Sequence, residues 1–240
     1  MDSVFIGLKT NTRAGLLCTW AGPAFVVLYS AGMLIAGLFP PTRPKDSAEQ
    51  VALFFVENHA MIGLGTILMC FGAGFIAVWA VAIAVQIRRT ELGSPLMTYA
   101  SLASAFFVAI DASLIPTLWA VVSFRAGEIS PDIVLILNDM GWFLFLFPWQ
   151  LGGGIWFIAV GLAILWDKNP QPVYPRWAGW ASLWFCVMTF PAGLIVFFKS
   201  GPFAYNGILA FYVPLGVLFI WVIAMTVVTL KAFNEQSEQC

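Results

Sequence analysis

Apolar residues run in long stretches, and short segments between them hold nearly all of the charges. Five stretches carry no charged residue, at 14–42, 60–87, 140–166, 177–198 and 200–230, and a sixth, 92–124, carries only Asp111. A helix needs about 20 residues to cross the hydrocarbon core of a bilayer, so each stretch is long enough. Transmembrane strands would need shorter segments of alternating polarity. The pattern therefore predicts an all-α, polytopic membrane protein.

The composition agrees with this prediction. Hydrophobic residues make up 61% of the 240 residues and charged residues only 10%, which is more apolar surface than a soluble chain of this length could bury. We expect one domain, 1–240, in direct contact with the lipid bilayer. The predicted spans are approximately 15–39, 61–87, 96–123, 140–166, 177–198 and 204–231.

The basic residues predict the orientation of the chain, because cytoplasmic loops carry an excess of Lys and Arg. With both termini inside, the four basic residues on the outer side are Arg43, Lys45, Arg125 and Lys199. The seven on the cytoplasmic side are Lys9, Arg13, Arg88, Arg89, Lys168, Arg176 and Lys231. This favours an N-in, C-in topology. Since no basic stripe is present, a nucleic-acid partner is not expected.

Several local motifs predict where helices begin and bend. Ser47-Ala48-Glu49-Gln50 fits a capping box at the start of an outer helix that runs to Asn58. Ser130-Pro131 predicts a second short outer helix that ends at Asp139. Pro148, followed by three glycines at 152–154, predicts a kink in the fourth span. Pro191 and Pro214 also interrupt apolar spans.

A weak internal similarity suggests a repeat. When the chain is shifted by 81 residues, 21–32 aligns with 102–113, and Ser30 takes the position of Asp111. Two helical hairpins would then be parallel copies, since an even number of helices preserves orientation.

Asp111 is the strongest candidate for a functional residue. A carboxyl group within the membrane is costly, so it is usually paired, buried in the bundle or functional. Pro116 lacks a backbone N–H and frees the carbonyl of Ala112, next to Asp111. From a rise of about 1.5 Å per helical residue, the residues at a similar depth are Tyr29, Ser30 and Gln150. These side chains predict either a buried substrate pocket or a hydrogen-bonded lock between helices.

A second group of candidates falls at the predicted outer boundary. Glu57, Asp139 and Asn206 lie there, and carboxylates at one opening can perform acid–base chemistry. They can equally be ordinary interfacial residues. We expect the group, together with His59, to flank one entrance.

Aromatic residues form a stripe along the fourth span. Trp142 and Trp149 are seven residues apart, and Trp156 continues the spacing. This stripe is consistent with helix packing, with a contact in a homo-oligomer, or with one wall of a lipophilic pocket. Aromatic faces attract cations, including carbocations, so such a wall would suit isoprenoid or sterol chemistry.

The sequence indicates neither a metal site nor a cofactor. The four cysteines include no CxxC pair, and His59 is the only histidine, which excludes a multi-histidine metal centre or bis-histidine haem within one chain. There is also no Walker A motif, and no lysine lies in the interior of a span.

Two segments resemble a known group. Pro175–Trp180, which reads PRWAGW, and Phe197–Gly207, which reads FFKSGPFAYNG, resemble an uncharacterised group of bacterial six-helix integral membrane proteins. The resemblance implies a multi-pass protein of the bacterial inner membrane. It implies no activity and no residue roles.

These observations lead to one leading hypothesis and two alternatives. The leading one is a protein that holds a lipophilic small molecule between its helices, most concretely an acid–base isomerase or cyclase. Asp111, Asp139 or Glu57 would transfer the proton, while the polar and tryptophan side chains named above would bind the substrate. The alternatives are a small transporter in which Asp111 carries a proton and a non-catalytic subunit of a membrane complex.

Overall fold

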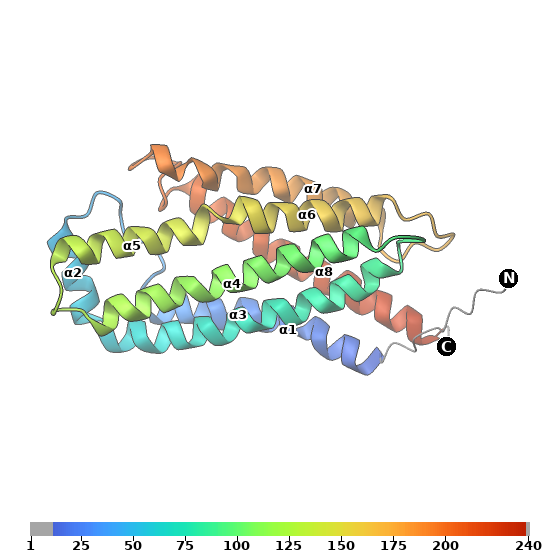
Figure 1. Ribbon diagram of the computed structural model, residues 1–240, viewed down its shortest axis with the longest axis horizontal. Helices are drawn as coiled ribbons and strands as arrows, with labels where there is room; N and C mark the ends of the chain where they lie inside the picture. The colour runs from blue at the N-terminus through green and yellow to red at the C-terminus, as the bar shows by residue number, and fades with distance from the viewer. Residues whose placement is uncertain (1–11, 239–240) are drawn as a thin grey trace.

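The computed structural model describes residues 12–238, and the regular secondary structure of this part of the chain is entirely helical, without strands. It contains six helical segments that are long and apolar enough to cross a membrane. The protein is therefore an all-helical, polytopic membrane protein, as predicted. The helices (Figure 1) are α1 Thr12–Ile35, α2 Ala48–Glu57, α3 His59–Arg88, α4 Leu96–Phe124, α5 Pro131–Leu146, α6 Trp149–Leu165, α7 Arg176–Thr189, η1 Phe190–Phe197, η2 Ile208–Tyr212 and α8 Val213–Glu238.

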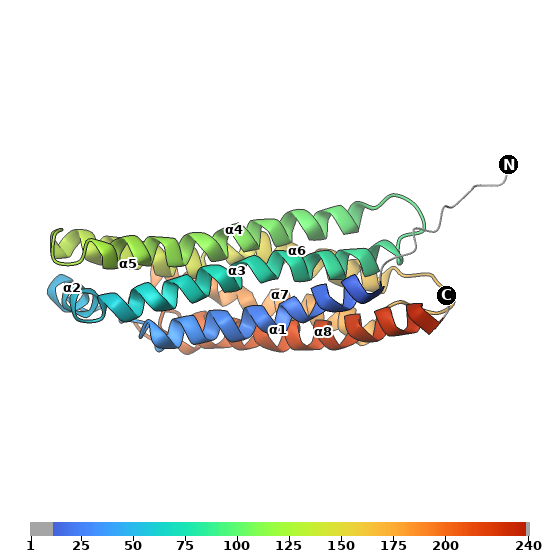
Figure 2. The same cartoon turned by 90° about the horizontal axis from the view of Figure 1, so that it is seen from below.

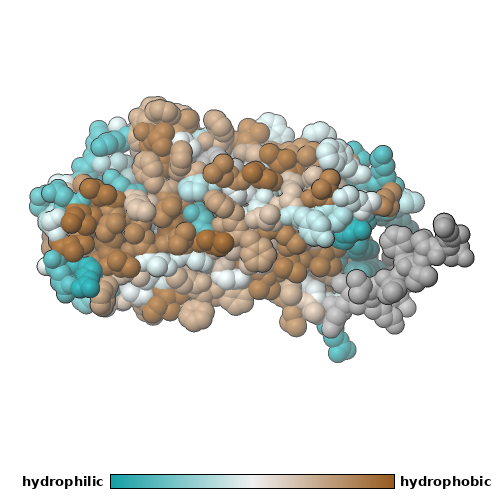
Figure 3. Space-filling view, viewed as in Figure 1, coloured by the Kyte–Doolittle hydropathy of each residue, from teal (hydrophilic) through white to brown (hydrophobic). Residues whose placement is uncertain are grey.

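The long helices form an elongated bundle. Figures 1 and 2 show α2 at one end, and the start of α1 and the end of α8 together at the other end. We call these the α2 end and the terminal end. Apolar residues cover much of the middle of the bundle, while hydrophilic residues gather at the two ends (Figure 3). This distribution fits a bilayer around the middle of the bundle.

Glycines allow α1 and α3 to pack closely. A Cβ atom on Gly65 of α3 would collide with the carbonyl oxygen of Gly32 in α1 and lie 2.7 Å from the Cβ of Ala36. Small residues at such contacts let helix backbones approach in membranes, where packing replaces the hydrophobic effect as the main source of association. The α1–α3 pair therefore forms a closely packed side of the bundle.

Three tryptophans fill the centre of the bundle from three different helices. Trp79 of α3, Trp156 of α6 and Trp221 of α8 have ring centroids 5.1–5.6 Å apart and edge-to-face geometry. All three are buried. Trp156 belongs to the predicted stripe, and here it packs inside the protein.

The helix boundaries confirm some local predictions and correct another. Ser47 and Gln50 form the reciprocal hydrogen bonds of the capping box at the start of α2. The short outer helix predicted to end at Asp139 is wrong, because α5 begins at Pro131 and continues without a break to Leu146. The apolar run after Asp139 extends the helix instead of starting a new one. The predicted hairpin repeat stays a prediction.

Three of the six spans are interrupted within the apolar region. The fourth span breaks between α5 and α6 at Phe147-Pro148, so the predicted kink is confirmed. The fifth span changes from α7 to the 3₁₀ helix η1 at Phe190, just before Pro191. The sixth begins as the π-helix η2 and becomes α8 at Val213, just before Pro214. Each interruption lies next to a proline, which removes a helical hydrogen bond.

Candidate functional site

The three interruptions meet around one cavity. Leu146 and Trp149 line it from either side of the α5–α6 break, Ala192 from η1, and Pro214 from the start of α8. The remaining lining residues come from α1, α4, α5 and α8. Irregular backbone at membrane depth is tolerated only where protein buries it or where it lines a cavity. The cavity therefore gives a physical reason for three irregular spans in one bundle.

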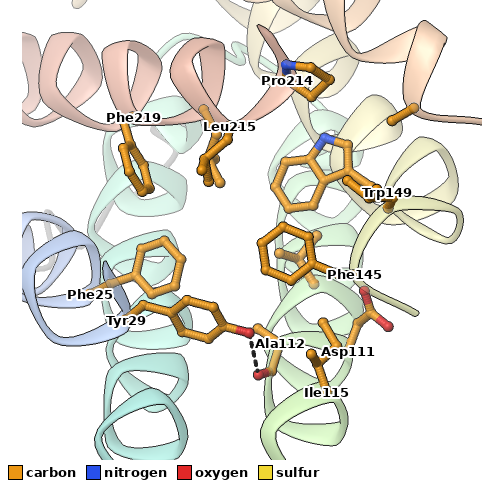
Figure 4. A pocket seen from close by; sticks show the side chains of 14 residues that line it. Phe25, Tyr29, Asp111, Ala112, Ile115, Phe145, Trp149, Pro214, Leu215 and Phe219 are labelled. Carbon is orange, nitrogen blue, oxygen red and sulfur yellow. Dashed lines mark hydrogen bonds between the residues drawn. The ribbon is translucent and has the colours of Figure 1, made fainter. Parts of the chain in front are cut away.

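The cavity is narrow and mainly apolar. It leaves about 50 Å³ for the centres of water-sized molecules, whereas one water needs about 10–15 Å³. In Figure 4, Phe25 and Tyr29 face it from α1, Phe145 and Trp149 from the α5–α6 segment, and Phe219 from α8. This shape suits a slender chain or a few waters. It would have to widen before it could hold a fused-ring sterol.

Asp111 supplies the one carboxyl group of the cavity lining. It is only 8% exposed, and no basic residue lines the cavity. Within residues 12–238, with the Gln150 side chain left aside, its carboxyl group has no hydrogen bond to another side chain. The partner that the lock hypothesis requires is therefore absent from the described side chains.

A hydrogen bond next to Asp111 ties α1 to α4. The hydroxyl of Tyr29 donates to the carbonyl oxygen of Ala112 at 3.2 Å (Figure 4). Pro116 cannot donate to this carbonyl, so Tyr29 satisfies the acceptor that the proline leaves free. Tyr29 thus has a structural task and also forms part of the cavity wall.

The cavity contains some of the predicted site residues and not others. Asp111, Tyr29 and Trp149 line it, whereas Ser30 does not. The hydroxyl oxygen of Ser30 is buried without a hydrogen-bond partner among the described residues. Gln150 lies in the first turn of α6, and its side chain is outside the described part of the structure.

Asp139 and Trp142 belong to a separate cluster near the α2 end. Asp139 accepts a hydrogen bond of 3.1 Å from the hydroxyl of Tyr205, and the rings of Tyr205 and Trp142 are stacked at 5.8 Å. Thr42 completes the cluster, because its hydroxyl oxygen accepts from Asn138 at 3.1 Å and from Trp142 at 2.8 Å. These contacts hold α5 to the loops before α2 and before η2.

Tyr205 acts in this cluster as a hydrogen-bond donor. Burial and the neighbouring carboxylate of Asp139 raise the pKa of the Tyr205 hydroxyl above its ordinary value, because each disfavours the phenolate. The hydroxyl therefore keeps its proton over the physiological pH range and continues to hold Asp139.

The predicted entrance at the outer boundary is formed only in part. Asp139 and the loop that carries Asn206 come together through Tyr205. Glu57, at the end of α2, is exposed, and its carboxylate makes no hydrogen bond or ion pair with any described residue. None of Glu57, Asp139, Trp142 and Asn206 lines the cavity at Asp111.

Two groups of important residues were not among the predicted site residues. Phe145, Leu215 and Phe219 line the cavity, and no polar signal distinguishes them from other apolar residues in their spans. Thr42 anchors the cluster at the α2 end, but its partners lie about 100 positions away in the sequence. The prolines at 148, 191 and 214 were the available signal, because all three mark the interruptions.

Replacing Thr42 by valine tests the cluster. The substitution keeps the shape but removes the oxygen that accepts from Asn138 and Trp142. Buried polar groups without a partner cost about 1–3 kcal/mol, so we expect Thr42→Val to lower the thermal stability of the purified protein measurably. Thr117→Val is the matched control, because the Thr117 hydroxyl is exposed, donates to the carbonyl oxygen of Ser113 in its own helix and otherwise contacts only the sulfur of Cys70, at 4.0 Å. Equal stability of the two variants would contradict the anchoring role.

Comparisons with known protein families, with curated proteins and with solved structures found no match for this chain.

Proposed function

We propose that this protein binds a slender lipophilic molecule in the cavity at Asp111, with a polar group of the molecule next to the carboxyl. The observation that carries the proposal is the meeting of three interrupted helices around a single carboxyl group in an aromatic, apolar cavity. Ligand pockets typically combine apolar walls with a few polar groups that orient the ligand.

The isolation of the carboxyl group favours binding over a structural lock. A buried polar group without a partner is costly, and a lock would remove that cost through a partner on another helix. Asp111 has no such partner among the described side chains, and it is one of the residues that line the cavity. A ligand that donates a hydrogen bond, such as an alcohol or an amine, would supply what the protein leaves unsatisfied.

The shape and walls of the cavity narrow the ligand class. Its small volume favours a linear, isoprenoid-like chain over fused rings. In the more specific form of the proposal the protein is an acid–base isomerase. Asp111 would give a proton to one carbon of an alkene and accept a proton from another, and the faces of Phe145 and Trp149 would stabilise the cation between the two steps. Asp139 is held by Tyr205 in the other cluster, so this form relies on Asp111.

Molecules that copurify with the protein test the proposal. We expect organic extracts of the wild-type protein to contain a lipophilic alcohol or amine. Extracts of Asp111→Leu should lack this molecule, and extracts of Asp111→Asn should contain at least tenfold less of it per protein. Ser113→Ala is the control on the same helix, because Ser113 is outside the cavity lining and bonds to Ala109. Identical extracts from the wild type and a folded Asp111→Leu would refute the proposal.

A proton-coupled transporter is the second candidate, and the interrupted spans favour it. Broken helices near the bilayer midplane form the substrate and ion sites of many transporters. In proteoliposomes with an internal pH dye, a transporter would move protons with its substrate, and Asp111→Asn would abolish this movement. If the protein is a binding protein or an isomerase, neither the wild type nor Asp111→Asn would show a proton flux.

A further inference from the structure

A second hollow lies at the terminal end of the bundle, and its chemistry differs from that of the cavity at Asp111. The end of α3, the loop between α6 and α7, and the last turns of α8 form it. It leaves about 390 Å³ for the centres of water-sized molecules, and its lining includes Arg89, Asn169, Gln171 and Glu235. We infer that this hollow binds an anionic phosphate group, and that the group belongs to the headgroup of a membrane phospholipid.

Arg89 is the residue that would hold the phosphate. Its Nη1 donates to the side-chain oxygen of Gln86 and, at 3.5 Å, to the carbonyl oxygen of Ala232. These two hydrogen bonds hold the half-buried guanidinium in place. A guanidinium has five N–H donors, and Nε and Nη2 have no hydrogen-bond partner within residues 12–238. A held guanidinium with free donors matches the geometry of phosphate oxygens.

The local charges also favour an anion. Glu235 lines the hollow, but the ammonium of Lys231 lies 3.6 Å from its carboxylate and offsets its charge. A smaller adjoining hollow shares Glu235 and is lined by Arg176 and Lys231. Basic side chains therefore lie on both sides of Glu235.

The distribution of charge between the two ends of the bundle also favours an anion at the terminal end. Over residues 12–237, the terminal end carries six basic and three acidic side chains, and the α2 end carries four basic and six acidic ones. Asp167, at the start of the loop between α6 and α7, is occupied by the loop itself, since its carboxylate accepts from the backbone N–H groups of Asn169 and Val173.

The position of the hollow indicates a lipid as the source of the phosphate. Trp166 and Trp177, on either side of the loop that forms it, are exposed. Exposed tryptophans gather at the level of lipid headgroups, and α6 ends and α7 begins at this level. A phospholipid could place its phosphate at Arg89 and its acyl chains along these helices.

Thermal unfolding of the purified full-length protein in detergent tests the inference. We expect dioleoylphosphatidylglycerol to raise the midpoint of unfolding, and dioleoylphosphatidylcholine to raise it less. Arg89→Gln should lose the difference between the two lipids. Arg88→Gln should retain it, because Arg88 is an exposed neighbour that bonds only to the carbonyl oxygen of Glu91. Arg89→Lys should retain part of the difference between the two lipids, since lysine keeps the positive charge but lacks the forked N–H donors of the guanidinium.

Each outcome decides the inference. If sodium phosphate alone reproduces the shift at Arg89, the phosphate site stands and its lipid source is wrong. If Arg89→Gln keeps the full preference for phosphatidylglycerol, or if the wild type shows no preference and no response to phosphate, the site is wrong. Should Arg89→Gln fail to fold, native mass spectrometry of Arg89→Lys and the wild type counts the retained phosphatidylglycerol, and equal counts overturn the role of the guanidinium fork.

Discussion

Trp221→Ala is expected to cause the largest loss of stability of any single substitution considered for this protein. Trp221 is 1% exposed, and its ring centroid lies 5.1 Å from that of Trp156, 5.3 Å from that of Trp79 and 4.7 Å from that of Phe157. Its indole N–H also donates to the hydroxyl of Ser182 at 2.9 Å. Removal of this ring would leave a void at the junction of α3, α6, α7 and α8.

The expected loss is up to about 3–5 kcal/mol, the range for Trp→Ala in soluble cores. Because unfolded membrane helices remain in an apolar medium, the loss here reflects packing and the hydrogen bond. Denaturation by SDS measures it. Trp180→Ala is the matched control, since Trp180 is 57% exposed. If the two variants lose equal stability, the tryptophan cluster does not hold the bundle together.

Gly65→Ala should also destabilise the protein strongly, because it adds a methyl group where there is no space, whereas Trp221→Ala leaves a void. The added methyl group would collide with the carbonyl oxygen of Gly32 and crowd Ala36, so α1 and α3 would have to separate. Overpacking of this kind costs about 1–3 kcal/mol, and a larger side chain would cost more.

Gly63 gives the control on the same helix, because a Cβ there meets no atom within 4 Å. We expect Gly63→Ala to be neutral or slightly stabilising, since alanine favours the helix over glycine by about 1 kcal/mol. Thermal unfolding of both variants in one detergent separates the effect of the steric collision from the effect of helix propensity. If Gly65→Ala is as stable as Gly63→Ala, the close approach of α1 and α3 is wrong.

The sequence predicts the spans well because lipid imposes a simple rule on them. Uncharged runs of sufficient length must be helical in a bilayer, and the predicted spans 61–87 and 96–123 differ little from α3 and α4. The boundary at Asp139 was misplaced for a related reason. A polar residue is acceptable in a helix when tertiary contacts satisfy it, and Asp139 is satisfied by Tyr205, 66 positions later in the chain.

The candidate site could be predicted only around its charged residue. Asp111 was identifiable because a carboxyl within a span is rare, and Tyr29 was identifiable from its depth. The sequence could not show that Phe145 and Phe219 would form the walls, because rotation about each helix axis decides which apolar residues face inward. Depth placed Asp139 at the outer boundary, apart from Asp111, but it could not show that Trp142 would stack on Tyr205 instead of lining the cavity.

The most direct test of the proposed function is a cryo-electron microscopy map of the protein in lipid nanodiscs. We expect elongated density in the cavity between Tyr29, Phe145 and Phe219, with one end within hydrogen-bonding distance of the carboxyl of Asp111, and we expect Asp111→Leu to lose that density. A cavity closed by its own side chains, or a continuous line of waters from Asp111 to the two membrane surfaces, would contradict the proposed function.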